Sequence, residues 1–108
     1  MDWVLTMQDE DGGMFHKLTT KNFEGMVMPH EATSQRYIVG KGTAASLDFA
    51  GAAAQAARVF MPYDSIYAKR CLQAAKKAYS WSVENPEVEF VNPEDITTGQ
   101  YGDTDFDV

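Results

Sequence analysis

The chain has 108 residues, 44% of them hydrophobic, and a formal net charge of −7. This composition is typical of one small folded domain, and the negative charge argues against nucleic acid as a partner. No stretch approaches the roughly 20 apolar residues of a membrane-spanning helix, and the N-terminus shows no signal-peptide pattern. Cys71 is the only cysteine, which excludes an internal disulfide.

The first 42 residues are predicted to be mostly irregular. Residues 1–8 resemble the last turns of a helix, whereas residues 9–42 hold five glycines and show no sustained period of two or 3.6. A loop of this length in a compact domain is usually functional. Within it, the stretch DGGMFHKLTTKNF at residues 11–23 is either a polar surface loop or a loop that binds a polar ligand.

Two helices are expected next, over about residues 43–60 and 65–84. The first starts at Thr43, a residue type that caps helices, and carries apolar side chains on nearly every face, as buried helices do. The second follows a cap at Asp64, is amphipathic, and stops at the Asn85-Pro86 pair. The short connection predicts antiparallel neighbours, with the first helix inside and the second outside.

The first helix needs more neighbours than this chain offers, because two helices do not bury a helix that is apolar all round. Either the chain self-associates or it is one part of a larger helical barrel, and we favour the second interpretation.

Residues 86–108 then form another long loop with an acidic end. Asp103, Asp105 and Asp107 alternate there, a spacing at which carboxylates bind calcium. The alternative is a solvated acidic loop.

Four segments, in order, resemble the catalytic domain of glycoside hydrolase family 9: DEDGGMFHKLTTKNFEGMVMP, RYIVGKGTAASLDFAGAAAQAARVF, YAKRCLQAAKKAYSWSVENP and NPEDITTGQYGD. Members are inverting cellulases, mostly endo-β-1,4-glucanases, built as an (α/α)6 toroid. The resemblance implies an all-α fold, with this chain forming an antiparallel inner and outer helical hairpin and about a quarter of the domain. It also implies an extracellular or periplasmic protein.

The resemblance implies that the catalytic carboxylates lie elsewhere. The family places two aspartates in an Asp-Ala-Gly-Asp-like motif and a glutamic acid near the end of the domain, and neither motif occurs here. An inverting mechanism needs its acid and base roughly 6.5–9.5 Å apart on opposite sides of the scissile bond. We therefore expect no glycosidase activity from this chain alone. The chemistry requires no cofactor, and the resemblance makes the three aspartates candidates for structural calcium, because family members often bind calcium at the loop where they fall.

The resemblance implies instead that the chain supplies loops to a cleft for β-1,4-glucan. His16 falls where family members have a cleft histidine, Phe15 is a candidate to stack on a sugar ring, and Lys17 is a candidate donor to hydroxyls. The alternatives are a structural histidine, a core-capping aromatic and a solvated lysine. Arg36 and Tyr101 are further substrate-binding candidates, each with a loop-anchoring alternative.

Two rival interpretations stay open at this stage. One is a non-catalytic carbohydrate-binding or assembly fragment that keeps only the helical hairpin. The other is a different α/α-toroid glycosidase, which the matched segments disfavour. Trp81 is interpreted as a packing residue rather than a sugar platform, because it lies far along the second helix.

Overall fold

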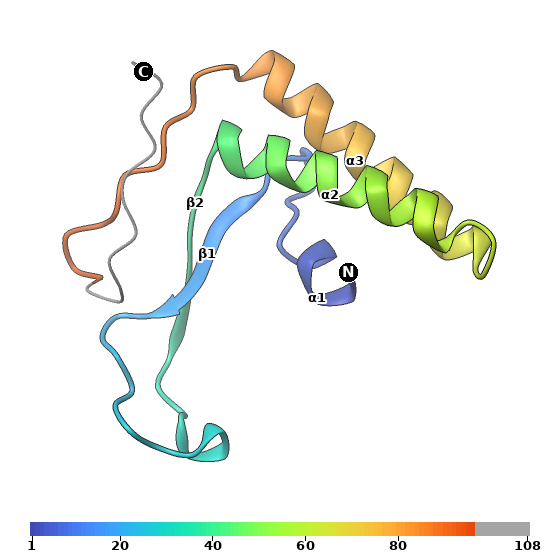
Figure 1. Cartoon of the computed structure of the whole chain (residues 1–108). Coiled ribbons are helices and arrows are strands. Elements are labelled where there is room, and N and C mark those ends of the chain that lie inside the picture. The colour runs from blue at the N-terminus through green and yellow to red at the C-terminus, as the bar shows by residue number, and fades with distance from the viewer. Residues whose placement is uncertain (97–108) are drawn as a thin grey trace.

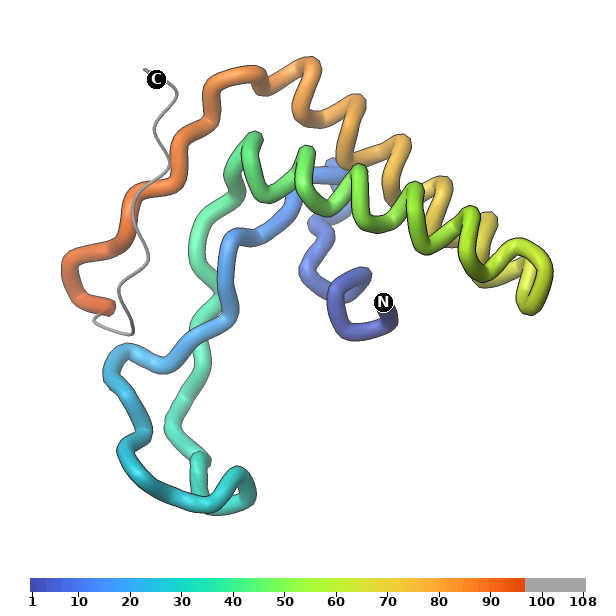
Figure 2. Tube along the Cα trace, viewed as in Figure 1, coloured from blue at the N-terminus to red at the C-terminus, as the bar shows by residue number. Residues whose placement is uncertain are grey.

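The chain forms a helical hairpin with a β-hairpin projecting from one end, in a computed structural model that describes residues 1–96 (Figure 1). The tube trace shows the segment after the last helix turning back beside the β-hairpin (Figure 2). In chain order the elements are α1 (Asp2–Leu5), β1 (Phe15–Thr20), a 3-10 turn η1 (Pro29–Glu31), β2 (Arg36–Lys41), α2 (Thr43–Phe60) and α3 (Ser65–Glu84).

The two long helices have the predicted bounds, and their first residues show why. The Asp64 side chain caps α3 by accepting a hydrogen bond from the backbone N–H of Tyr67 at 3.0 Å. At α2 the N-cap is Gly42, so Thr43 is the first helical residue rather than the expected cap. The Thr43 hydroxyl instead donates to the carbonyl of Asn85 and accepts from the N–H of Val88. It therefore ties the start of α2 to the segment after α3.

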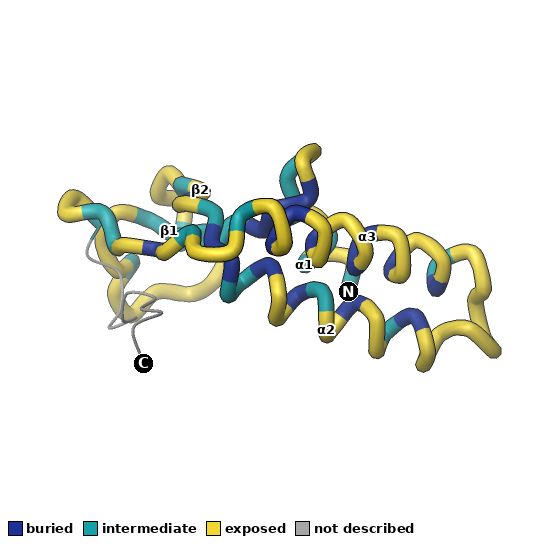
Figure 3. The backbone as a smooth tube through the Cα atoms, turned by 90° about the horizontal axis from the view of Figure 1, so that it is seen from above, coloured by how far each residue is buried: buried dark blue, intermediate teal, exposed yellow. Residues whose placement is uncertain are grey.

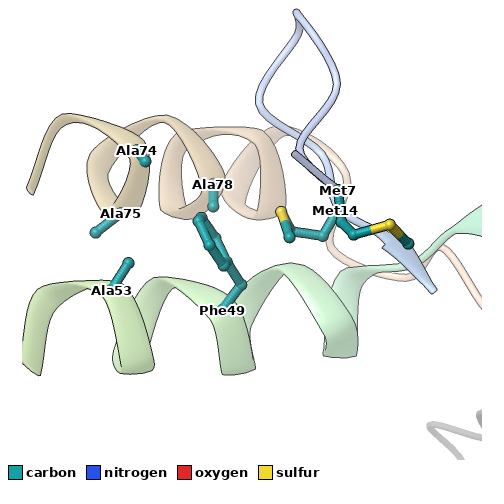
Figure 4. Close-up of a cluster of buried hydrophobic side chains, with 7 residues drawn as sticks. All are labelled: Met7, Met14, Phe49, Ala53, Ala74, Ala75 and Ala78. Carbon is teal, nitrogen blue, oxygen red and sulfur yellow. The ribbon is translucent and has the colours of Figure 1, made fainter. Parts of the chain in front are cut away.

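The hydrophobic core lies between α2 and α3 and is built largely from alanine. Phe49 points from α2 toward Ala78 of α3, Ala53 lies nearby on α2, and Met7 and Met14 complete the cluster beside them (Figure 4). The small alanine side chains let the two helices approach closely. Phe49 is the one aromatic residue among the buried members of the cluster.

The expectation of a structureless segment at residues 9–42 is wrong, and the all-α expectation holds only in part, because a two-stranded sheet accompanies the helices. β1 and β2 pair antiparallel, with Phe15 opposite Lys41 and Thr20 opposite Arg36. β1 escapes a search for period two because every one of its residues is half-buried, which gives no alternation. The two strands also lack a tight-turn signal, since residues 21–35 separate them.

Within the described residues, α2 is buried on one side only. Its buried positions are Thr43, Ser46, Phe49, Ala53 and Ala57. Figure 3 shows exposed stretches along the outer sides of both helices. A groove of about 630 Å³ between them is lined mainly by apolar side chains, among them Leu47, Leu72 and Tyr79. None of the helices in residues 1–96 combines the length and apolarity of a membrane span.

Gly51 lines this groove in the interior of α2, and its replacement by alanine is expected to stabilise the chain. A Cβ atom at Gly51 meets nothing within 4 Å, so the substitution restores helix propensity without a clash. We expect the free energy of unfolding to rise by about 0.5–1 kcal/mol, as measured by urea denaturation of the 108-residue chain. Ala52→Gly, on the exposed side of the same helix, is the matched control with the opposite sign. A loss of stability in Gly51→Ala would contradict the open groove.

Candidate functional site

The loop before β1 is bound closely to α3. The side-chain nitrogen Nε2 of Gln8 donates to the backbone carbonyls of Gly12 and Ala74, both at 3.0 Å. Gly12 has a φ of +103°, and its position for a Cβ lies 2.6 Å from the carbonyl oxygen of Lys77. Only a glycine fits this approach, because the left-handed backbone and the contact with α3 both exclude a side chain.

An ion cluster fixes the same loop to the end of β2. The ammonium of Lys41 lies 2.8 Å from a carboxylate oxygen of Asp9 and 2.7 Å from one of Asp11. Asp11 also accepts a hydrogen bond from the indole N–H of Trp81 at 3.0 Å. These hydrogen bonds to Lys41 lower the pKa of both carboxyls and raise the pKa of Lys41. The cluster therefore stays charged at neutral pH and joins loop, strand and helix at the base of the β-hairpin.

His16 is the residue of β1 that follows Phe15, the partner of Lys41 in the strand pair. Its ring stacks on a phenylalanine from the other end of the chain. The His16 and Phe90 rings are parallel within 8°, with centroids 3.7 Å apart. Burial, and to a smaller extent the charge of Lys17, lower the pKa of His16. The neutral imidazole carries one donor and one acceptor nitrogen, which is the hydrogen-bonding capacity that a sugar hydroxyl matches.

The structure brings some of the predicted substrate-binding residues together and separates others. Phe15 packs against the hydrophobic cluster, and the Lys17 ammonium donates to the side chain of Asn92 at 2.9 Å. Arg36 is exposed at the far end of the β-hairpin, opposite Thr20. Because Thr20 is four positions beyond His16, Arg36 lies roughly 13 Å along the strand at about 3.3 Å per residue.

The remaining predicted site residues fall outside the described part of the chain. Tyr101 and the proposed calcium ligands Asp103, Asp105 and Asp107 all follow residue 96. Among residues 1–96, no group of three or more histidines, cysteines or acidic residues is placed to hold a metal ion.

Sequence reasoning missed Phe90, Asn92 and the three charged residues of the Lys41 cluster. Phe90 is 2% exposed and lies in a segment that was expected to be loop. Its one local signal is the ValGluPhe alternation at residues 88–90, which is too short to predict a buried position. The charged residues resemble any solvated surface, because only the β-hairpin brings Lys41 next to Asp9 and Asp11.

The lowered pKa of His16 predicts a pH dependence of stability. Protonating this imidazole costs more in the folded chain than in the unfolded chain, where the imidazole has its ordinary pKa of 6.5. Below pH 6.5 the unfolded chain therefore binds the proton more readily than the folded chain does. The free energy of unfolding is therefore expected to fall as the pH drops from 6.5 through the folded-state value. Urea denaturation between pH 5 and 8 measures this, above the range in which Asp9 and Asp11 titrate.

His16→Gln is expected to remove this part of the pH dependence. His30→Asn is the matched control, since it removes the chain's other histidine, which lies in the exposed turn η1. If the loss of stability at low pH persisted in His16→Gln and vanished in His30→Asn, the assignment to His16 would be wrong.

Known proteins match this chain along nearly its whole length. Residues 1–107 match the family description of glycosyl hydrolase family 9. A xyloglucan-specific endo-β-1,4-glucanase of Bacteroides ovatus is 48% identical, over 99% of this chain and 20% of its own length. Endoglucanase D of Acetivibrio thermocellus is 43% identical, over 94% of this chain and 16% of its own length.

Solved structures superpose equally well. A Bacteroides ovatus family 9 structure matches with a TM-score of 0.86 and 46% identity, over 94% of this chain and 20% of the other. AaCel9A in complex with a cellobiose-like isofagomine matches with a TM-score of 0.88 and 37% identity, with the same two shares covered. The chain thus spans about a fifth of the length of these relatives. Since both sequence and fold agree over almost every residue, the chain belongs to glycosyl hydrolase family 9.

Proposed function

We propose that this chain is a segment of an inverting endo-β-1,4-glucanase, and that it lines the glucan cleft without supplying the catalytic carboxylates. The observation that carries the proposal is the match of residues 1–107 to the family. The names of the relatives support the substrate class, since they include a xyloglucan-specific endo-β-1,4-glucanase, an endoglucanase and a cellodextrinase.

The carboxylates at the base of the β-hairpin support the non-catalytic part of the proposal. Asp9 and Asp11 lie in the loop that leads into β1, shortly before His16, and both are bound to Lys41. A general acid needs a raised pKa to hold its proton at neutral pH, whereas the pKa of both carboxyls is lowered. Neither group suits that role, and we expect the isolated chain to hydrolyse no glucan.

His16 is the residue that we propose as the main substrate contact. It is half-buried at the base of β1 and is held neutral by burial. A neutral imidazole hydrogen-bonds a sugar hydroxyl without the cost of desolvating a charge. Phe15, Lys17 and Arg36 stay secondary candidates, because Phe15 packs inward, Lys17 contacts Asn92, and Arg36 lies far along the strand.

The exposed apolar surface supports a partner for the helical hairpin. Leu47 and Tyr79 are 43% and 60% exposed beside the groove, and contiguous apolar surface of this kind marks an interaction site. We propose that the remainder of a catalytic domain, an (α/α)6 toroid, covers it, and that the isolated chain self-associates.

We also propose an extracellular or periplasmic site of action and a calcium ion at Asp103, Asp105 and Asp107.

A segment exchange tests the proposed role of His16. Residues 1–107 replace the matching segment of the Bacteroides ovatus relative, and the chimera is assayed on xyloglucan. His16→Ala in the chimera is expected to lower kcat/KM by roughly 10- to 100-fold, the effect of losing one or two hydrogen bonds in a desolvated site. The control His30→Ala should leave kcat/KM unchanged. Unchanged activity in His16→Ala would reject His16 as a substrate contact.

A further inference from the structure

The segment after α3 follows the β-hairpin from its base outward, with contacts at successive positions. The N–H of Val88 donates to Thr43 at 2.9 Å, and the Thr43 N–H donates back to the carbonyl of Val88 at 3.0 Å. Phe90 then stacks on His16, and Asn92 accepts from Lys17. Figure 1 shows this segment running beside the strands. The segment after α3 therefore packs against β1 at both of these positions.

A glycine of β2 makes room for Phe90 beside His16. Gly40 has a φ of +47°, and its position for a Cβ lies 3.0 Å from the Phe90 ring. A side chain at Gly40 would therefore press on the ring, and its absence lets Phe90 sit on the backbone of β2. Phe90 is 2% exposed, and its place is fixed by the backbone of β2 at Gly40 and by the imidazole of His16.

Tethering the segment does not require an aromatic ring at this position. The paired hydrogen bonds between Thr43 and Val88 already hold the segment to the start of α2. An aliphatic side chain would also fill the space. What a flat ring adds is orientation, because a parallel stack within 8° restricts rotation of the imidazole about its own bonds.

We propose that Phe90 is a positioning residue of the glucan site, which acts by fixing the plane of the His16 imidazole. This inference rests on the proposed function of His16. The stack covers one face of the imidazole, so the ring meets a sugar hydroxyl with its edge, where the nitrogen atoms lie. Preorganising this edge removes rotational freedom before the substrate binds.

A double-mutant cycle in the chimera tests the proposal. Phe90→Leu keeps an apolar side chain but removes the stack, and it is expected to lower kcat/KM roughly three- to tenfold. In the His16→Ala background the same substitution should have no further effect, because Phe90 acts through His16. Val91→Ala, at a neighbouring position that is 65% exposed, is the control and should leave kcat/KM unchanged in both backgrounds.

The outcomes separate this inference from the proposed function. If His16→Ala leaves kcat/KM unchanged, the proposed function of His16 fails, and the inference fails with it. If His16→Ala lowers kcat/KM but Phe90→Leu is harmless, or lowers it equally in both backgrounds, Phe90 is structural and the inference alone fails.

Nuclear magnetic resonance on the 108-residue chain gives a second readout that does not need the chimera. The aromatic ring current of Phe90 should displace the imidazole proton resonances of His16, and Phe90→Leu should return them toward the positions seen in the unfolded chain. Resonances that are undisplaced in the unsubstituted chain would overturn the stacked arrangement.

Discussion

Gly12→Ala is expected to lower the free energy of unfolding by about 3–5 kcal/mol. Two costs combine at this position. A side chain at a φ of +103° is strained, and the new Cβ would lie 2.6 Å from a backbone oxygen of α3, which has no flexible end to move. Domains of this size have a total stability of about 5–15 kcal/mol. Urea denaturation of the 108-residue chain should therefore show a greatly lowered midpoint.

Gly25→Ala separates the two costs. Gly25 also has a positive φ, of +81°, but a Cβ there meets nothing within 4 Å. We expect only the conformational penalty, about 1 kcal/mol. Equal losses in the two variants would show that the loop before β1 does not pack on α3 as described.

Trp81→Ala is expected to cost about 3–5 kcal/mol, the range for removing a buried aromatic side chain. Trp81 is 7% exposed, and Gly13 lies directly on its ring, with the position for a Cβ only 2.7 Å from a ring carbon. Its indole N–H also donates to Asp11 of the Lys41 cluster. Loss of the ring therefore leaves a cavity and detaches the loop that leads into β1.

Trp3→Ala is the matched control, because Trp3 is the other tryptophan and is 61% exposed. We expect a change within about 0.5 kcal/mol. Trp81→Phe keeps most of the ring but loses the donor, and should fall between the two. A Trp81→Ala variant as stable as Trp3→Ala would contradict the burial of Trp81. Thermal or urea unfolding of the three variants decides this.

The helices were predictable because their signals are local. The cap at Asp64, the breakers at Pro62 and Pro86, and the period of the apolar residues all lie within a few positions of the helix ends. The interpretation of Trp81 as a packing residue is confirmed. Tyr79 of the same helix is 60% exposed, because it borders the groove rather than the core.

The β-hairpin and the surroundings of His16 were not predictable, because they depend on contacts between distant residues. Lys41 meets Asp9 only once β1 and β2 pair. Phe90 reaches His16 only because the chain turns back after α3. Sequence resemblance singled out His16, but it gave no indication of its stacking partner. Local periodicity carries no information about such pairs.

The activity of the unsubstituted chimera is the most direct test of the central claim, that this chain is an exchangeable cleft segment of a family 9 glucanase. With residues 1–107 in place of the matching segment of the Bacteroides ovatus relative, we expect hydrolysis of xyloglucan within about tenfold of the parent kcat/KM, a difference of about 1.4 kcal/mol in transition-state stabilisation. A chimera that unfolds cooperatively near the parent's temperature yet hydrolyses no glucan would contradict the claim.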